Sequence, residues 1–270
     1  MAIIDAQIHL WGKGVPTHLH IERPYLVDEA IRDMDEAGID GAVIHPPNWD
    51  EDSNELALAA VRAHPTRFVI LGNFPLDKIE SRALVPIWKQ EPGRLGLRFY
   101  FTDPHKRTWP MDGTMDWFWP AAEKAGLPVA LLADDFLPLL GTIAARHPGL
   151  KLIVDHMGAH RIFHGGEAAF VTRKDLVALA KYPNVAVKLT GGPFYADDPY
   201  PFRSLHPHYR ALYDAFGPRR LFWGTDITKM PCTWRECVSH FQEIDWIPAA
   251  DKKLIMGDAL CEWIGWKRGG

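Results

Sequence analysis

A single carboxylate, Asp226, ends a short apolar run that reads RLFWGTD. A run of this length between helix-breaking residues is typical of a buried parallel strand. In α/β barrels the catalytic groups stand at the carboxyl ends of the strands, so Asp226 is a candidate catalytic residue. The alternative is that Asp226 only caps the loop or helix that follows, as aspartate often does.

The first apolar run of the chain also ends in polar residues, DAQIH at 5–9. Strict alternation along a strand would place Asp5, Gln7 and His9 on one face. Buried polar groups need partners, so three of them directed into a barrel indicate a site rather than packing. The alternative is that Gln7 and His9 bond only to each other and to loops.

Two further runs carry polar residues, Asp155-His156 and Lys188. His156 could be a metal ligand, polarise a carbonyl or carry a proton. Asp155 is expected to fix the orientation of an imidazole. Lys188 lies between apolar residues, where an unpaired ammonium is costly. It is expected either to form an ion pair with Asp155 or Asp226 or to bind a substrate anion.

Arg98 and His45 are two further polar residues in the apolar runs. A guanidinium donates two parallel hydrogen bonds to a carboxylate, so Arg98 is a candidate for binding an acidic substrate. The alternative is a salt bridge that holds a helix. His45 ends its run and is a candidate for the mouth of the barrel. The aromatic candidates for an apolar pocket wall are Trp11, Trp49, Trp109, Trp223 and Tyr195. Other histidines lie in expected loops and give no individual signal: His18, His20, His160, His164, His206 and His208.

Eight apolar runs recur along the chain and are mostly separated by amphipathic segments. They are Ile3–Leu10, Gly41–Pro46, Phe68–Pro75, Leu95–Phe101, Pro128–Ala133, Leu152–Gly158, Val185–Gly191 and Leu221–Asp226. Helices are expected over 27–38, 53–64, 114–126, 136–147, 173–182, 208–216 and 251–266. The pattern predicts an α/β fold, a (β/α)₈ TIM barrel, with residues 1–270 as one domain. An open doubly wound sheet is the alternative, but no glycine-rich phosphate motif follows the first run.

Two segments are longer than the barrel needs, His105–Gly113 and Gly192–Pro207. Long loops that follow strands lie on the carboxyl face, so we expect both to form pocket walls.

Composition excludes several classes of protein. The formal net charge is -4 and the 30 basic residues are scattered, which disfavours nucleic-acid and membrane-surface binding. No apolar stretch approaches the roughly 18–20 residues that span a bilayer. The amino-terminal text has no basic leader, and the three cysteines have no metal-ribbon spacing. Reduced thiols and a cytoplasmic location are therefore expected.

Taken in order, the motifs resemble the amidohydrolase superfamily, specifically the amidohydrolase-related (amidohydrolase 2) branch that includes TIM-barrel lactonases and decarboxylases. The resemblance covers nearly the whole chain and rests on DAQIHLW, LGLRF, VDHMG, VKLTG, FWGTD and IMGDALCEW. It implies that His9, His156 and Asp226 meet at the mouth of the barrel, where they could hold one divalent ion. The branch usually has Asp-x-His-x-His on the first strand, and here Gln7 replaces the first histidine. An amide is a poorer zinc ligand than imidazole, so both a zinc ion and metal-free catalysis remain open. No lysine on the fourth strand matches a two-metal site.

The resemblance favours a hydrolase that opens a lactone or related cyclic ester. Asp226 would be the general base, and His156 and His9, or a bound cation, would stabilise the oxyanion. Arg98 and Lys188 would hold a substrate carboxylate, with Gln7, His45 and Tyr195 as further substrate-binding residues. A metal-dependent, non-oxidative decarboxylase of an aromatic or unsaturated acid is the second interpretation, and a non-catalytic binding barrel is the third. The expected partner is a small molecule, and a homodimer stays open because such barrels often pair.

Overall fold

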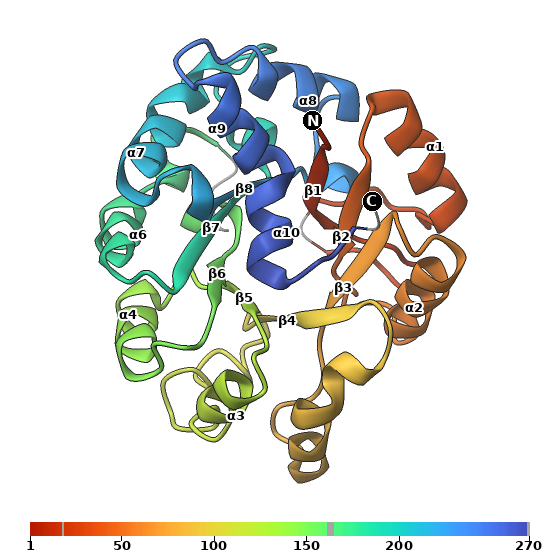
Figure 1. The fold of residues 1–270 in the computed structure, drawn as a ribbon, viewed down its shortest axis with the longest axis vertical. Coiled ribbons are helices and arrows are strands. Elements are labelled where there is room, and N and C mark those ends of the chain that lie inside the picture. Colours follow the sequence, from red (N-terminus) through yellow and green to blue (C-terminus); the bar gives the residue numbers. More distant parts are fainter. Residues whose placement is uncertain (18, 161–164, 269–270) are drawn as a thin grey trace.

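The computed structural model describes residues 1–17, 19–160 and 165–268. It contains eight parallel strands in sequential order, arranged as a nearly closed barrel with helices around it (Figure 1). The strands are β1 (Ile4–Ile8), β2 (Gly41–Ile44), β3 (Phe68–Gly72), β4 (Arg94–Tyr100), β5 (Val129–Leu132), β6 (Leu152–Val154), β7 (Val185–Leu189) and β8 (Leu221–Trp223). Each lies within or next to one of the eight apolar runs. The prediction of an α/β, (β/α)₈ TIM barrel is therefore confirmed. His18 and His164 lie outside the described residues.

Helices follow the strands along the outside of the barrel. They are α1 (Val27–Ala37), α2 (Ser53–Ala63), α3 (Phe118–Lys124), α4 (Leu137–Arg146), α5 (Gly166–Ala169), α6 (Arg173–Ala178), α7 (His206–Phe216), α8 (Trp234–Gln242), α9 (Ala249–Lys253) and α10 (Ala259–Ile264). Two differences from the predicted helices stand out. Ile79–Gln90 forms a 3₁₀ segment with a proline inside it. Helix α8 was not among the predicted helices, although its Thr233–Glu236 capping box is a sequence signal for the start of a helix. Among the described residues, no helix has the length and apolar character to cross a membrane.

The amino-terminal end of the barrel is closed by α10, which lies across the middle of the ring of strands in Figure 1. Residues Leu260 and Ile264 of this helix pack with inward-facing residues such as Ile4, Val69 and Phe222. These contacts form an apolar plug inside the lower half of the barrel. Helix α10, which lies within the last predicted helix, thus covers the amino-terminal end of the barrel. The polar residues lie toward the opposite, carboxyl end of the strands.

Strands β8 and β1 meet through specific polar contacts at their carboxyl ends. The backbone N–H of Asp226 donates to the carbonyl of Gln7 at 2.9 Å. The carboxylate of Asp5 accepts hydrogen bonds from the Thr225 N–H at 2.9 Å and from the Trp234 indole at 2.8 Å. Because these bonds cross from the first strand to the chain after the last one, they hold the two ends of the sheet together.

The expectation that Asp5, Gln7 and His9 share one face is wrong for Asp5. The pairing register of β1 with β2 shifts between Asp5 and Ile8. A local irregularity of this kind breaks the period-two alternation. Asp5 therefore reaches Trp234 of α8, whereas the Gln7 side chain contacts His156 across the barrel interior.

A buried ionic layer lies above the apolar plug. Asp155 Oδ2 accepts from Arg98 Nε at 2.7 Å, and its Oδ1 lies 2.8 Å from Lys188 Nζ. The ammonium of Lys188 also donates to Gln7 Oε1 at 3.1 Å and to His45 Nε2 at 3.0 Å. Burial alone would raise the pKa of Asp155, but the charges of Lys188 and Arg98 outweigh it and hold that pKa well below its usual range. The ionic layer is the floor on which the mouth of the barrel is built.

Gly224 provides a test of how β8 closes onto β1. A Cβ at this position would lie 2.6 Å from the backbone nitrogen of Ala6 and 2.8 Å from Asp5 Oδ1. Gly224→Ala should lower the free energy of unfolding by about 1–3 kcal/mol, the usual range for overpacking. Gly12→Ala is the matched control, because its new methyl would meet its nearest atom at 3.6 Å. Denaturant unfolding of both variants measures the difference, and equal losses would contradict the predicted clash.

Asp155 provides a test of the ionic layer. Asp155→Asn leaves the buried Lys188 and Arg98 without their shared counter-charge. Removing one partner of a buried ion pair typically costs about 3–5 kcal/mol, and we expect a loss of that size in denaturant unfolding at neutral pH. The exposed Asp245→Asn serves as control. A loss of unfolding free energy no larger than that of the control would show that the ionic layer contributes nothing to stability.

The same carboxyl group predicts a pH dependence. Its pKa is depressed in the folded protein, so its contribution is present above the unfolded-state value of about 3.9 and is lost as the pH falls below it. The unfolding free energy of the wild type should therefore fall more steeply between about pH 4.5 and 2.5 than that of Asp155→Asn. Parallel curves for the two proteins would rule this out.

Candidate active site

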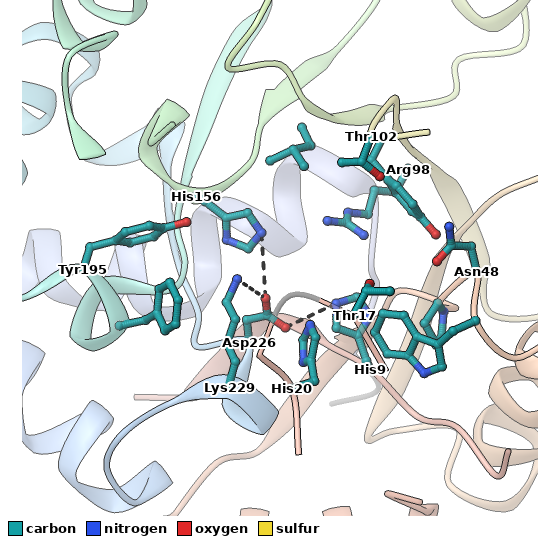
Figure 2. A pocket seen from close by; sticks show the side chains of 15 residues that line it. His9, Thr17, His20, Asn48, Arg98, Thr102, His156, Tyr195, Asp226 and Lys229 are labelled. Carbon is teal, nitrogen blue, oxygen red and sulfur yellow. Dashed lines mark ion pairs between the residues drawn. The ribbon is translucent and has the colours of Figure 1, made fainter. Parts of the chain in front are cut away.

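The carboxyl ends of the strands surround one cavity at the mouth of the barrel (Figure 2). Its lining combines charged, imidazole and other polar side chains with aromatic ones. The lining residues are His9, Thr17, His20, Pro47, Asn48, Trp49, Arg98, Tyr100, Thr102, Leu132, His156, Phe194, Tyr195, Asp226 and Lys229. The predicted meeting of His9, His156 and Asp226 at one site is therefore what the structure contains.

Asp226 is the central group of this cavity. Its Oδ1 lies 3.2 Å from His9 Nε2, and its Oδ2 lies 2.8 Å from Lys229 Nζ and 3.8 Å from His156 Nε2. Burial would raise the pKa of this carboxyl, but Lys229, followed by His9 and His20, lowers it well below its usual range. The side chain makes no capping hydrogen bond to the 3₁₀ turn that follows, which removes the capping alternative.

The backbone at two of these strand ends is left-handed. Asp226 has φ 61°, and His156 and Met157 have φ 51° and 57°. L-residues rarely adopt this region. Here the sharp turn directly after β6 and β8 brings His156 and Asp226 to the cavity instead of letting the chain continue outward.

His156 is held in one tautomer by a chain of hydrogen bonds from the ionic layer. Lys188 can only donate, so Gln7 presents Oε1 to it and its amide NH₂ to His156 Nε2, at 3.2 Å. His156 Nε2 therefore accepts, and Nδ1–H donates to Thr190 Oγ1 at 2.9 Å. Burial, and then the charge of Lys229, lower the pKa of His156 well below its usual value. His156 is thus a neutral imidazole with a fixed orientation.

The rings of His9 and His20 are each anchored through Nδ1. His9 Nδ1 donates to the His45 carbonyl at 2.6 Å, and His20 Nδ1 lies 2.7 Å from Thr228 Oγ1. A metal-binding histidine usually has its second ring nitrogen held by an oxygen in this way. With Nδ1 engaged, the other ring nitrogen of His9, Nε2, faces the Asp226 carboxylate.

Three of the cavity residues could hold a metal ion, namely His9, His20 and Asp226, whose ligand atoms all lie within 4.8 Å of one another. The 3.2 Å between His9 Nε2 and Asp226 Oδ1 is close to the edge of a tetrahedron with ligand distances of about 2.1 Å. His9 Nε2 and Asp226 Oδ1 face each other inside the cavity, where both could bind the same cation. The donor set therefore fits a divalent ion.

The predicted ligand set contained His156 in place of His20. The lone pair of His156 Nε2 already accepts from the Gln7 amide. Gln7 lies under His156 and hydrogen-bonds to it through one end of its amide and to Lys188 through the other, and the ligand set of His9, His156 and Asp226 stays a prediction. Sequence patterns did not single out His20, because it lies in a loop rather than at a strand end.

The predicted substrate-binding residues fall into two groups. Arg98 and Tyr195 line the cavity, and the guanidinium of Arg98 is directed toward it (Figure 2). Gln7, Lys188 and His45 do not line it, because they are fully buried in the layer below. Lys188 forms the ion pair with Asp155 that was one of its two predicted roles.

The expected pocket walls are also divided. Phe194 and Tyr195 bring the segment 192–207 to the cavity, and Trp49 joins them. Residues Lys106 and Trp109 of the segment 105–113 line a neighbouring pocket instead. Two other candidate wall residues are buried in the core, Trp11 and Trp223.

Sequence reasoning missed Lys229. It lies three residues after Asp226 in a 3₁₀ turn, Ile227–Lys229, in which positions i and i+3 fall on the same side. The spacing D-x-x-K was therefore the available signal.

Comparisons with known proteins agree with this geometry. The amidohydrolase family model matches residues 4–266. An L-fucono-1,5-lactonase of Burkholderia ambifaria is 31% identical over 247 residues, covering 83% of this chain and 79% of the relative. A 4-sulfomuconolactone hydrolase of Hydrogenophaga intermedia is 26% identical over 235 residues, covering 82% and 73%.

Solved structures show the same fold. An amidohydrolase of Burkholderia multivorans, crystallised with bound zinc, superposes with a TM-score of 0.80 at 20% identity, covering 98% of this chain and 99% of that one. With a family model that spans almost the whole chain and a relative above 30% identity, the conclusion is direct. The chain belongs to the amidohydrolase family.

Proposed function

We propose that this protein hydrolyses a lactone or a related cyclic ester. The observation that carries the proposal is the ionised carboxylate of Asp226, buried at the cavity and surrounded by His9, His156 and Lys229. A general base must be deprotonated at working pH, and the depressed pKa of Asp226 meets that requirement. The two curated relatives, a lactonase and a lactone hydrolase, favour this reaction over others.

In the proposed reaction, Asp226 accepts a proton from water as the water oxygen attacks the ring carbonyl. When the resulting intermediate collapses, the ring C–O bond breaks and Asp226 returns its proton to the leaving alkoxide. The tetrahedral intermediate carries a negative oxygen, which needs a donor or a positive charge nearby. His156 donates through Nδ1 to Thr190 and accepts at Nε2, so it presents no N–H to that oxygen. His9 donates its Nδ1–H to the His45 carbonyl and directs Nε2 at Asp226 rather than at the substrate. We therefore assign oxyanion stabilisation to Lys229 rather than to the histidines.

Arg98 is proposed to bind a carboxylate on the substrate. Its Nε is bonded to Asp155, which fixes the plane of the guanidinium and leaves the Nη edge toward the cavity. Arg98 is also 5.1 Å from the centre of the Tyr100 ring, a second restraint on its position. A substrate with an acidic group is thus favoured over a neutral one.

A divalent ion, zinc by analogy with the solved relative, fits His9, His20 and Asp226. When bound, such an ion would polarise the carbonyl or lower the pKa of a bound water.

The Asp226 proposal is tested with a lactone panel of sugar δ-lactones and muconolactone-type compounds, assayed with and without added metal. Asp226→Asn should lower kcat/KM by about 10²–10⁴-fold, because general base catalysis is lost. The control is Asp245→Asn on the exposed surface, which should keep wild-type rates. If the wild type opens no compound in the panel but releases CO₂ from aromatic acids, the chain is a decarboxylase and the proposal is wrong.

The Arg98 proposal is tested with paired substrates that differ only in a carboxylate. Arg98→Lys keeps the charge toward Asp155 but loses the paired N–H donors. We expect KM to rise about 10- to 100-fold for the acidic lactone, the equivalent of one charge-assisted hydrogen bond. The neutral lactone is the internal control and should show little change. An equal effect on both substrates would mean that Arg98 supports the fold rather than the ligand.

A further inference from the structure

Lys229 is a cation built into the wall of the cavity. Its Nζ lies 2.8 Å from Asp226 Oδ2, and its side chain is only 8% exposed. The ring of Phe194 lies 5.4 Å from the ammonium and covers it on one side. Figure 2 shows Lys229 beside Asp226 at the cavity, across from Arg98. The ammonium therefore belongs to the site and is not a surface charge.

Lys229 and the candidate metal site share one carboxylate. Asp226 directs Oδ1 toward His9 and Oδ2 toward Lys229. A divalent ion held by His9, His20 and Asp226 would draw on the same negative charge that the ammonium already neutralises. Asp226 brings one negative charge to this cluster, and the ammonium of Lys229, 2.8 Å from Oδ2, balances it. The cluster as folded thus offers a divalent ion no net negative charge.

We propose that Lys229 is a built-in cation that competes with a divalent metal for Asp226. Its ammonium supplies the positive charge that such an ion would bring to this site. The ammonium neutralises the carboxylate and faces the cavity in which the oxyanion forms. The wild type is consequently expected to bind zinc weakly and to need no zinc for catalysis. The part of this inference that concerns catalysis rests on the proposed lactone hydrolysis, whereas the part that concerns metal affinity does not.

Zinc binding tests the inference without any substrate. Purified apoprotein is titrated with zinc in competition with a chromogenic chelator, and bound zinc is counted by elemental analysis after dialysis. Lys229→Gln and Lys229→Met should each bind one zinc per chain at least about tenfold more tightly than the wild type, because a like charge a few ångströms from the ion is removed. The exposed Lys174→Gln is the matched control and should bind as the wild type does.

Two more variants separate charge from shape. Lys229→Arg keeps the positive charge, so its zinc affinity should stay as low as that of the wild type. Adding His20→Ala to Lys229→Gln should remove the gain, because a proposed ligand is lost. Equal zinc affinity in the wild type and both uncharged variants would overturn the inference, and so would a gain of the same size in Lys229→Arg.

The uncharged variants leave a buried carboxylate without its ammonium and could unfold. They are therefore also refolded with zinc present, and circular dichroism follows their thermal unfolding. Recovery of folded protein by zinc supports the inference, because the ion then replaces the lost charge. A variant that zinc does not restore counts against it.

A kinetic comparison completes the test. If the wild type opens a lactone, that rate should resist a chelator, whereas Lys229→Gln should be active only with zinc. A wild-type rate that the chelator abolishes would overturn the inference while the proposed function stands. If no lactone is opened, the proposed function fails, and the zinc affinities still decide the role of Lys229.

Discussion

The carboxylate of Asp155, held between Arg98 and Lys188 inside the barrel, is the interaction on which the site depends. Both cations are buried, and the ionised carboxylate is the negative charge that they share. Buried ion pairs seldom add stability over apolar packing of the same volume. The value of this one lies in position: it fixes the plane of Arg98 at the cavity and the direction of the Lys188 ammonium below it.

From Lys188 the same constraint extends upward. The ammonium determines which end of the Gln7 amide faces it, and the other end of the amide determines the tautomer of His156. Gln7 also accepts the Asp226 N–H through its backbone carbonyl, so one residue of β1 orients groups from β6 and from the end of β8. The replacement of histidine by glutamine on the first strand therefore does not leave an idle position. It links the floor of the barrel to its mouth.

Much of this structure could be predicted from the sequence. Parallel strands covered on both faces are nearly continuous apolar runs, and this is why all eight strands were visible. Polar residues at the ends of such runs stand out, so Asp226, His9 and His156 were identified as neighbours. Asp5 was misplaced because a register shift in β1 has no signature in residue type. His20 was missed because a loop residue is placed by tertiary contacts, here its bond to Thr228.

The left-handed backbone at Asp226, His156 and Met157 has a consequence for engineering. Glycine would adopt the observed dihedral angles without strain, but at residue 226 it would leave the buried Lys229 ammonium without its counter-charge. The loss of a buried ion-pair partner costs more than the backbone strain that glycine would relieve. Selection for heat resistance is thus expected to retain the left-handed aspartate, and directed evolution of this barrel should hold residue 226 constant.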